Sequence, residues 1–148
     1  MRAAGSADLP RVAALRWAWG TEGNGASDTL PREMFVDAFL RWAQQNDDSH
    51  RCLVAERGHE LVGMAWLALT SRVPSPRRVD RWTGDLQSVY VVPAHRSAGV
   101  GAALIEAARA HAAALGVERL VVHSSERAVR FYERAGFMDS ELLRHRRP

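Results

Sequence analysis

The chain has 148 residues, 47% of them hydrophobic, and a formal net charge of +3. This length and composition predict one packed domain over residues 1–148 and exclude a disordered or fibrous protein. No apolar run approaches the roughly 20 residues that span a bilayer, and no signal-peptide pattern is present, so we expect a cytoplasmic protein with no membrane partner.

The first half of the chain begins with two predicted helices. Apolar residues at helical spacing mark one helix from Leu9 to Trp19 and a second from about Pro31 to Gln44. The segment 20–28 between them is rich in Gly, Ser, Asn and Asp and is predicted as a loop. Polar residues are placed to cap both helices, namely Ser6 or Asp8 for the first and Thr29 for the second.

Three strands are predicted next. The short apolar runs 53–56 and 61–67 are separated by a hairpin-sized turn, so we expect them to pair antiparallel. A long loop over 71–84, with two prolines and four arginines, is predicted to precede a third strand over 85–92. Cys52 directly precedes the first of these apolar runs and is predicted to be a buried side chain. It is the only cysteine, so no internal disulfide can form.

The second half alternates strands and helices. An alanine-rich helix over 99–115 and a strand over 119–123 follow the strand 85–92, and this unit is expected to form a right-handed parallel crossover. A last helix from Ser124 or Ser125 to Gly136 precedes a weak strand over 137–144. Antiparallel strands followed by βα units predict a mixed α/β sheet.

Charge and metal-ligand patterns exclude two classes of partner. The 20 basic residues are all arginines, and they are scattered among 17 acidic residues. A nucleic-acid-binding surface needs basic residues gathered on one face, so nucleic acid is not an expected partner. The six histidines show no metal-ligand spacing, and we expect no bound metal.

The transition from strand 85–92 to the helix at Gly99 predicts an anion site. The first N–H groups of a helix have no partner within it, and the helix dipole is positive at that end. Glycines there let a phosphate approach the backbone. A dinucleotide fold is excluded, because Leu104 replaces the third glycine and residues 93–98 separate the strand from the glycines. Neither a P-loop lysine nor a Gly-x-Ser-x-Gly elbow is present.

The loop and helix start read Arg96-Ser97-Ala98-Gly99-Val100-Gly101. This pattern resembles the Arg/Gln-x-x-Gly-x-Gly/Ala signature of the Gcn5-related N-acetyltransferase (GNAT) family. The run Val89 to Pro93 resembles the central strand of that family, and Ala128 to Phe137 resembles its late helix, which often reads A-x-x-x-Y-x-x-x-G-F. The resemblance covers nearly the whole chain and implies a GNAT-like acyl-CoA N-acyltransferase fold.

The resemblance implies acetyl-CoA as a cosubstrate. Its pyrophosphate would lie on the backbone N–H groups of Ser97, Ala98, Gly99, Val100, Gly101 and Ala102. Its pantetheine arm would lie beside the strand near Val89 and Val91, where the Val91 N–H would polarise the thioester carbonyl. Arg96 either pairs with phosphate or ends the strand–helix loop, and Ser125 either contacts the cofactor or only caps the last helix.

The resemblance also implies that Tyr132 protonates the leaving thiolate, although the same side chain would serve as a core aromatic. Acetyl transfer needs a base as well, because an amine of pKa ~10.4 is only about 0.04% neutral at pH 7. Gln87 stands about where many members carry a glutamate, and an amide is no base. Asp85 lies two residues earlier on the same strand face and is our candidate, with Glu22, Glu126 or a water chain as alternatives.

The expected function is transfer of an acetyl group from acetyl-CoA to a primary amine of a small molecule or peptide, by direct attack, in a monomer or homodimer. The alternative is a non-catalytic acyl-CoA sensor on the same scaffold. The first two helices, the loop 20–28 and the loop 71–84 are expected to wall the acceptor site. Three tryptophans either line that site or belong to the core, namely Trp17, Trp66 and Trp82.

Overall fold

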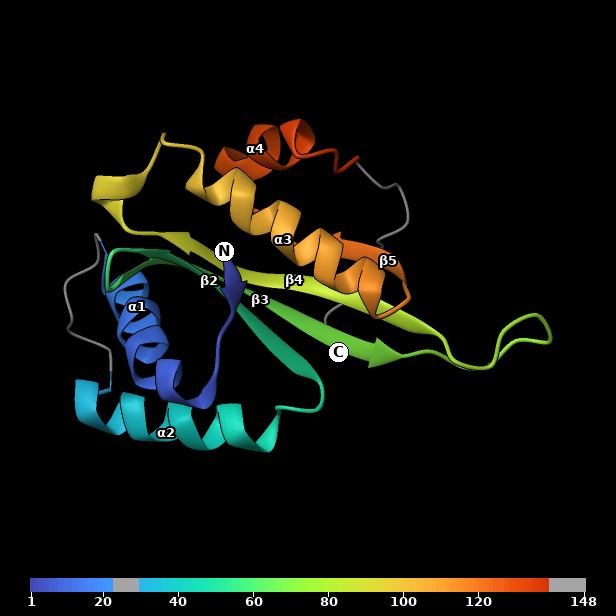
Figure 1. The fold of residues 1–148 in the computed structure, drawn as a ribbon, viewed down its shortest axis with the longest axis horizontal. Coiled ribbons are helices and arrows are strands. Elements are labelled where there is room, and N and C mark those ends of the chain that lie inside the picture. Colours follow the sequence, from blue (N-terminus) through green and yellow to red (C-terminus); the bar gives the residue numbers. More distant parts are fainter. Residues whose placement is uncertain (23–29, 139–148) are drawn as a thin grey trace.

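A five-stranded sheet forms the centre of the protein in the computed structural model, which describes residues 1–22 and 30–138. The strands lie side by side in chain order (Figure 1). Their bounds are β1 Arg2–Ala3, β2 His50–Arg57, β3 Glu60–Ser71, β4 Trp82–Val91 and β5 Val117–Val122. The first four pair antiparallel, and β4 pairs with β5 in parallel. The mixed sheet predicted from the sequence is therefore confirmed.

Helices cover both faces of this sheet. One face carries α1 and α2, and the other carries α3 with α4 beyond it (Figure 1). The bounds are α1 Leu9–Thr21, α2 Arg32–Gln45, α3 Val100–Ala114 and α4 Val129–Arg134, with short 3-10 turns η1 Ser6–Asp8, η3 Pro93–His95 and η4 Glu126–Ala128. Within the described ranges, no helix is long and apolar enough to cross a membrane.

The covered sheet explains why its central strand reads as a continuous apolar run. On the α1/α2 face, Met64 and Trp66 of β3 pack with Val12 of α1. On the α3 face, Ala65 of β3 packs with Leu104 of α3. Cys52 is buried, as predicted, and burial raises the pKa of its thiol to about 12, so the thiol is an inert core group.

The predicted loop over 71–84 is too long. The strand β3 continues to Ser71 and β4 begins at Trp82, directly opposite it. Three of the four arginines in this segment pair with Glu118 of β5. Arg72 Nη1 donates to its carboxylate at 2.7 Å and Arg81 Nε at 2.9 Å. These ion pairs hold the base of the hairpin to the sheet.

Two other predicted ends differ or fall outside the described residues. The first helix continues through Gly20 and Thr21, so the loop after it begins later than predicted. The rest of that loop and the predicted cap Thr29 lie in 23–29, outside the described residues. The last helix starts as η4 before becoming α4. Most of the predicted strand over 137–144 lies in 139–148, outside the described residues.

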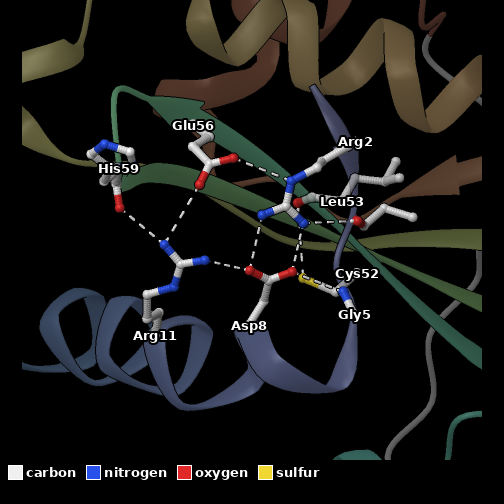
Figure 2. A network of polar contacts seen from close by, with 9 residues as sticks. Arg2, Gly5, Asp8, Arg11, Cys52, Leu53, Glu56 and His59 are labelled. Carbon is white, nitrogen blue, oxygen red and sulfur yellow. Dashed lines mark hydrogen bonds and ion pairs between the residues drawn. The ribbon is translucent and has the colours of Figure 1, made fainter.

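A polar network joins the start of the chain to the sheet (Figure 2). Asp8 is only 5% exposed. Its carboxylate accepts hydrogen bonds from Arg2 Nη1 at 2.5 Å, Arg11 Nη2 at 2.5 Å and the Gly5 N–H at 2.9 Å. Glu56 of β2 pairs with the same two arginines, at 3.2 and 3.6 Å. The network therefore fastens β1 and the first turn of α1 to β2.

Candidate active site

A β-bulge in β4 determines which side chains of this strand face α1 and α2 and which face α3. Two residues, Ser88 and Val89, lie opposite the single residue Ala65 of β3, and Ser88 has a positive φ of 50°. An extra residue shifts the alternation of side chains by one. Before the bulge, Gln87 faces α1 and α2, whereas after it Val89 and Val91 pack on the α3 side.

The strands β4 and β5 part just before this bulge. Their pairing ends with Leu86 opposite Val122, and within the described residues the rest of β4 has no partner on that edge. The Val92 N–H donates to Val62 O of β3 at 3.0 Å. Because N–H groups alternate along a strand, the Val91 N–H points to the open edge. The Val91 carbonyl at that edge accepts a hydrogen bond from Arg96 Nε at 2.9 Å.

The N-terminus of α3 lies directly after this open edge. Gly99 is the N-cap with φ 78°, Ser97 is also left-handed with φ 60°, and both are exposed. The first bond within the helix runs from the Ala103 N–H to Gly99 O at 3.0 Å. The preceding N–H groups, those of Val100 to Ala102, have no partner in the helix, and no N-cap side chain covers them. This geometry suits an anion.

The two glycines of the loop have different surroundings. A Cβ built on Gly99 meets no atom of the described residues within 4 Å, so its role is the left-handed turn. A Cβ on Gly101 would lie 3.0 Å from Phe131 Cζ and 3.7 Å from Val91 Cγ2. Gly101 therefore allows α4 to approach α3 and β4.

We expect Gly101→Val to destabilise the fold by about 1 to 3 kcal/mol, because the added side chain overpacks the contact with Phe131. Urea unfolding measures this loss. The control is Ala110→Val on the exposed side of α3, which should cost only about half a kcal/mol of helix propensity. Equal losses in the two variants would mean that the close approach of α4 does not depend on Gly101.

Tyr132 lies on α4, on the α3 side of the open edge. Its ring contacts the rings of Phe131 and Phe137, with centroids 5.2 and 5.7 Å apart. It packs in the same apolar cluster as Val89 and Val91. Burial raises the pKa of the Tyr132 phenol, so the phenol stays protonated at neutral pH.

Asp85 lies on the opposite face of β4. Gln87 Nε2 donates to Asp85 Oδ2 at 2.7 Å, so the two side chains share one face, as predicted. Asp85 Oδ1 is buried and accepts no hydrogen bond from the part of the chain that the structure describes. The nearest imidazole nitrogen is His123 Nδ1, at 3.7 Å. A carboxylate oxygen left without a donor is a candidate proton acceptor.

His123 is a neighbour that the sequence reading missed. It follows the last residue of β5, one residue beyond the end of the pairing with β4. The predicted parallel register of these strands was the available signal. His50 of β2 lies on the same face of the sheet as Asp85. Ala68 of β3 pairs with His50 on one side and with Asp85 on the other. Burial lowers the pKa of His50, Arg51 adds to this effect, and Asp85 opposes it.

Arg96 is held at the other end of the open edge. Besides the Val91 carbonyl, it binds Glu22 Oε2 through Nη2 at 2.8 Å, and its guanidinium lies 5.6 Å from the centroid of the Tyr90 ring. These contacts fasten the strand–helix loop to the end of α1. The Arg96 guanidinium also lowers the pKa of the Glu22 carboxyl, which makes Glu22 a weaker base.

The remaining predicted site residues lie at the start of the last helical segment. Ser125 is the N-cap of η4, and the Ala128 N–H donates to its backbone oxygen at 2.9 Å. Within the described residues its hydroxyl makes no capping bond. Glu126 is exposed in the first turn of η4. Ser125 and Glu126 therefore lie beyond the last residue of β5, outside its pairing with β4.

Two hollows lie in the described part of the structure, one in each helical layer. One, of about 520 Å³, lies between α3 and α4 and is lined by Ala102, Ala103, Ile105, Glu106, Arg109, Arg134, Ala135 and Gly136. The other, of about 230 Å³, lies between the bulge and the helices α1 and α2. Its lining is Arg16, Phe35, Phe39, Trp42, Trp66, Gln87 and Ser88.

The three tryptophans proposed for the acceptor site have different places. Trp66 lines the smaller hollow. Trp17 packs on Phe35, with ring centroids 5.4 Å apart. Trp82 begins β4, five residues before Gln87, or roughly 16 Å along the strand. The sequence reading missed the α2 aromatics of the hollow, because their helical spacing marked them as core residues.

Sequence comparison identifies relatives of the chain. The model of the acetyltransferase (GNAT) family matches residues 12–137. A mycothiol acetyltransferase of Propionibacterium freudenreichii is 36% identical over 105 residues, which cover 68% of this chain and 32% of that protein. A glucosamine 6-phosphate N-acetyltransferase of Trypanosoma brucei is 35% identical over 81 residues, 55% of this chain and 53% of that one. The chain thus spans about a third and about half of these relatives.

Solved structures share the fold. A predicted acetyltransferase of Clostridium acetobutylicum, solved with acetyl-CoA, has a TM-score of 0.79 at 15% identity, with 99% of this chain and 94% of that chain covered. A GCN5-related N-acetyltransferase of Ralstonia eutropha has a TM-score of 0.75 at 28% identity, with 98% and 95% covered. Because the family model matches most of its length, the chain belongs to the GNAT family of acetyltransferases.

Proposed function

We propose that this protein transfers the acetyl group of acetyl-CoA to a primary amine of a small molecule or peptide. One observation carries the proposal. The open edge of β4 presents the Val91 N–H directly before the uncapped N-terminus of α3, and Asp85 and Tyr132 lie on its two faces. A thioester at this edge would have a proton acceptor on one side and a proton donor on the other.

The residues present fit acetyl-CoA. The N–H groups from Ser97 to Ala102 would hold its pyrophosphate, and the edge at Val89 and Val91 would hold its pantetheine arm as an added strand. The larger hollow begins at Ala102, and its lining holds Arg134 and an Arg109 that pairs with Glu106 at 3.0 Å. Its net positive charge favours a further phosphate there. Arg96 would reach a phosphate only by leaving Glu22; in its present contacts it orders the loop.

The transfer then needs two proton movements. The amine nitrogen attacks the carbonyl carbon of the thioester, a C–N bond forms, and the C–S bond breaks. The amine proton passes through a chain of waters to Asp85, which lies six residues before Val91 on β4, or roughly 17 to 20 Å along the strand. Tyr132 protonates the departing thiolate, whose thiol pKa is ~8.5. The Val91 N–H stabilises the negative charge on the carbonyl oxygen. No acyl-enzyme is required.

A non-catalytic acyl-CoA sensor is the less favoured function. The absence of a glutamate at Gln87 motivated that alternative. Asp85 argues against that alternative, because its carboxylate lies on the same face of β4, 2.7 Å from the Gln87 amide nitrogen.

Acetyl-CoA should raise the thermal stability of the protein. At 100 times its Kd, a ligand that binds only the folded state adds ~2.7 kcal/mol. Thermal unfolding with acetyl-CoA and with adenosine alone measures the contribution of the thioester and phosphate portions. The proposed function fails if acetyl-CoA gives no shift, or if it gives a shift but no amine in a broad panel releases the thiol.

Tyr132→Phe should lower kcat by about 10²-fold, the lower end for general acid catalysis, because a thiolate is already a fair leaving group. The phenylalanine ring preserves the contacts with Phe131 and Phe137, so stability should not change. An acetyl thioester of a more acidic thiol should recover the lost rate. The other tyrosine, Tyr90, lies on the α1 face, and Tyr90→Phe is the matched control. If both variants keep the wild-type kcat, Tyr132 is not the proton donor.

A further inference from the structure

The smaller hollow has aromatic walls. Phe35, Phe39 and Trp42 follow one another along one face of α2, and their ring centroids are separated by 5.9 and 6.0 Å. Trp66 of β3 completes the wall, 5.2 Å from Trp42 and 5.8 Å from Phe39. Trp42 remains 38% exposed. Large aromatic side chains that stay partly open around a hollow are typical of a ligand site.

The floor of this hollow is the place where an acceptor amine would react. Gln87 and Ser88 form it. Gln87 directly precedes the bulge and Ser88 begins it, next to the point where β4 leaves β5. Asp85 lies on the same face, hydrogen-bonded to Gln87. A ligand between the aromatic wall and this floor would therefore hold its amine beside Gln87, where the open edge begins.

The only charge in the lining is positive. Arg16 of α1 is half-buried and lies 4.7 Å above the Trp19 ring. Within the described residues it forms no ion pair with a carboxylate, whereas Arg2, Arg11 and Arg96 each do. None of the seven lining residues is acidic. The lining therefore favours a ligand with an anionic group and disfavours a polycation.

We propose that the acceptor is a small primary amine that carries both an aromatic ring and a carboxylate, the simplest case being an aromatic amino acid. The ring would pack against Phe39 and Trp42, and the carboxylate would bind Arg16. This proposal rests on the acetyltransferase function proposed above. The smaller hollow has a volume of about 230 Å³, below the roughly 300–1,000 Å³ that is usual for drug-sized ligands. It therefore suits a small acceptor. A sugar would find few polar partners there besides Arg16, Gln87 and Ser88.

The first test is a thiol-release assay with acetyl-CoA and five amines: L-phenylalanine, L-tryptophan, phenethylamine, glucosamine 6-phosphate and spermidine. We expect the highest kcat/KM for one of the two amino acids. A higher value for glucosamine 6-phosphate or spermidine overturns the proposed acceptor but leaves the acetyltransferase function intact. If phenethylamine equals phenylalanine, the carboxylate assignment is wrong.

Two variants test the proposed contacts of the acceptor ring with Trp42 and of the acceptor carboxylate with Arg16. Trp42→Leu should raise KM for phenylalanine about tenfold through the loss of an aromatic contact. Arg16→Gln should raise it about tenfold or more through the loss of a charge-assisted hydrogen bond, with no effect on phenethylamine. The controls are Trp82→Leu, since Trp82 is 37% exposed at the far end of β4, and Arg41→Gln on the exposed face of α2. Equal effects in variants and controls would overturn the assignment.

A binding measurement separates the two proposals. Calorimetry with N-acetyl-L-phenylalanine, the expected product, needs no turnover. Binding that Trp42→Leu and Arg16→Gln weaken supports the aromatic site even if no amine is acetylated, in which case only the acetyltransferase function fails. Absence of binding at millimolar product, with acetyl-CoA still giving its thermal shift, overturns the aromatic acceptor.

Discussion

Asp85→Asn should lower kcat by about 10²- to 10³-fold while the KM for acetyl-CoA stays unchanged. An acceptor ammonium must lose a proton before it attacks, and an asparagine amide cannot take it. Asp85 has the position for this task, because Oδ1 accepts no hydrogen bond within the described residues and Oδ2 is held by Gln87 at 2.7 Å. Steady-state kinetics as a function of pH measures the effect.

An exchange of the two side chains gives a rescue test. In the double variant Asp85→Asn with Gln87→Glu, a carboxylate and an amide still face each other on the same side of β4. We expect this variant to regain part of the activity that Asp85→Asn alone loses. Wild-type activity in Asp85→Asn would rule out the base role and favour a water chain.

His123→Asn separates the base from its neighbour. This change removes the imidazole that lies 3.7 Å from Asp85 Oδ1. Activity that survives in His123→Asn but not in Asp85→Asn assigns the proton to Asp85. An equal loss in both variants assigns it to the Asp85–His123 pair. In either case the thermal stability of the two variants should be compared, so that a folding defect is not counted as a chemical one.

The strand–loop–helix unit could be predicted from the sequence because its signals are local. A strand over 85–92, glycines at 99 and 101 and an alanine-rich helix follow each other within thirty residues. The shared face of Asp85 and Gln87 follows from the period of two along a strand. Local patterns therefore predicted the glycine-rich start of α3 and the shared face of Asp85 and Gln87, whereas the roles of these residues stay predictions.

The bulge could not be predicted, because the alternation of apolar residues carries no mark of one extra residue. Ser88 is an ordinary strand residue in the sequence, yet its φ of 50° reverses the faces of everything after it. As a result Tyr90 faces α1, whereas Val89 and Val91 face α3. The opening between β4 and β5 depends on this tertiary geometry.

Long-range pairs and the aromatic hollow were missed for a related reason. Arg96 binds Glu22 across 74 positions of the chain, and no spacing rule connects them. The α2 aromatics repeat with the helical period, which is the same for a core stripe and for a pocket wall. Only the packing of α2 on Trp66 of β3, which leaves a hollow beside the bulge, distinguishes a partly open wall from a filled core.

Asp8→Asn should lower the free energy of unfolding by about 2 to 4 kcal/mol, the largest stability loss we expect from a change in one charge. The carboxylate is 5% exposed and pairs with Arg2 and Arg11 (Figure 2). An asparagine keeps one acceptor oxygen but turns an N–H donor toward a guanidinium. Because the arginine side chains are 42% and 44% exposed, water offsets part of the loss. Urea unfolding at pH 7 measures it.

The same carboxylate predicts a pH dependence with a definite sign. Hydrogen bonds from Arg2, the Gly5 N–H and Arg11 hold the pKa of Asp8 well below its usual range. A lowered pKa in the folded state stabilises the protein at pH values above the unfolded pKa of ~3.9, and this stabilisation is lost as the pH falls below it. The difference between wild type and Asp8→Asn should therefore be constant from pH 7 to about pH 5 and shrink progressively below pH 4.

Glu56→Gln is the matched control for this prediction. Glu56 pairs with the same two arginines, at 3.2 and 3.6 Å, but its side chain is 32% exposed. An exposed pair contributes at most about 1 kcal/mol, so Glu56→Gln should cost much less than Asp8→Asn. Equal losses would mean that the number of ion pairs, and not the burial of Asp8, fixes the start of α1. Since Arg16 of the smaller hollow lies on α1, a loosened start of this helix should also raise the KM of the amine.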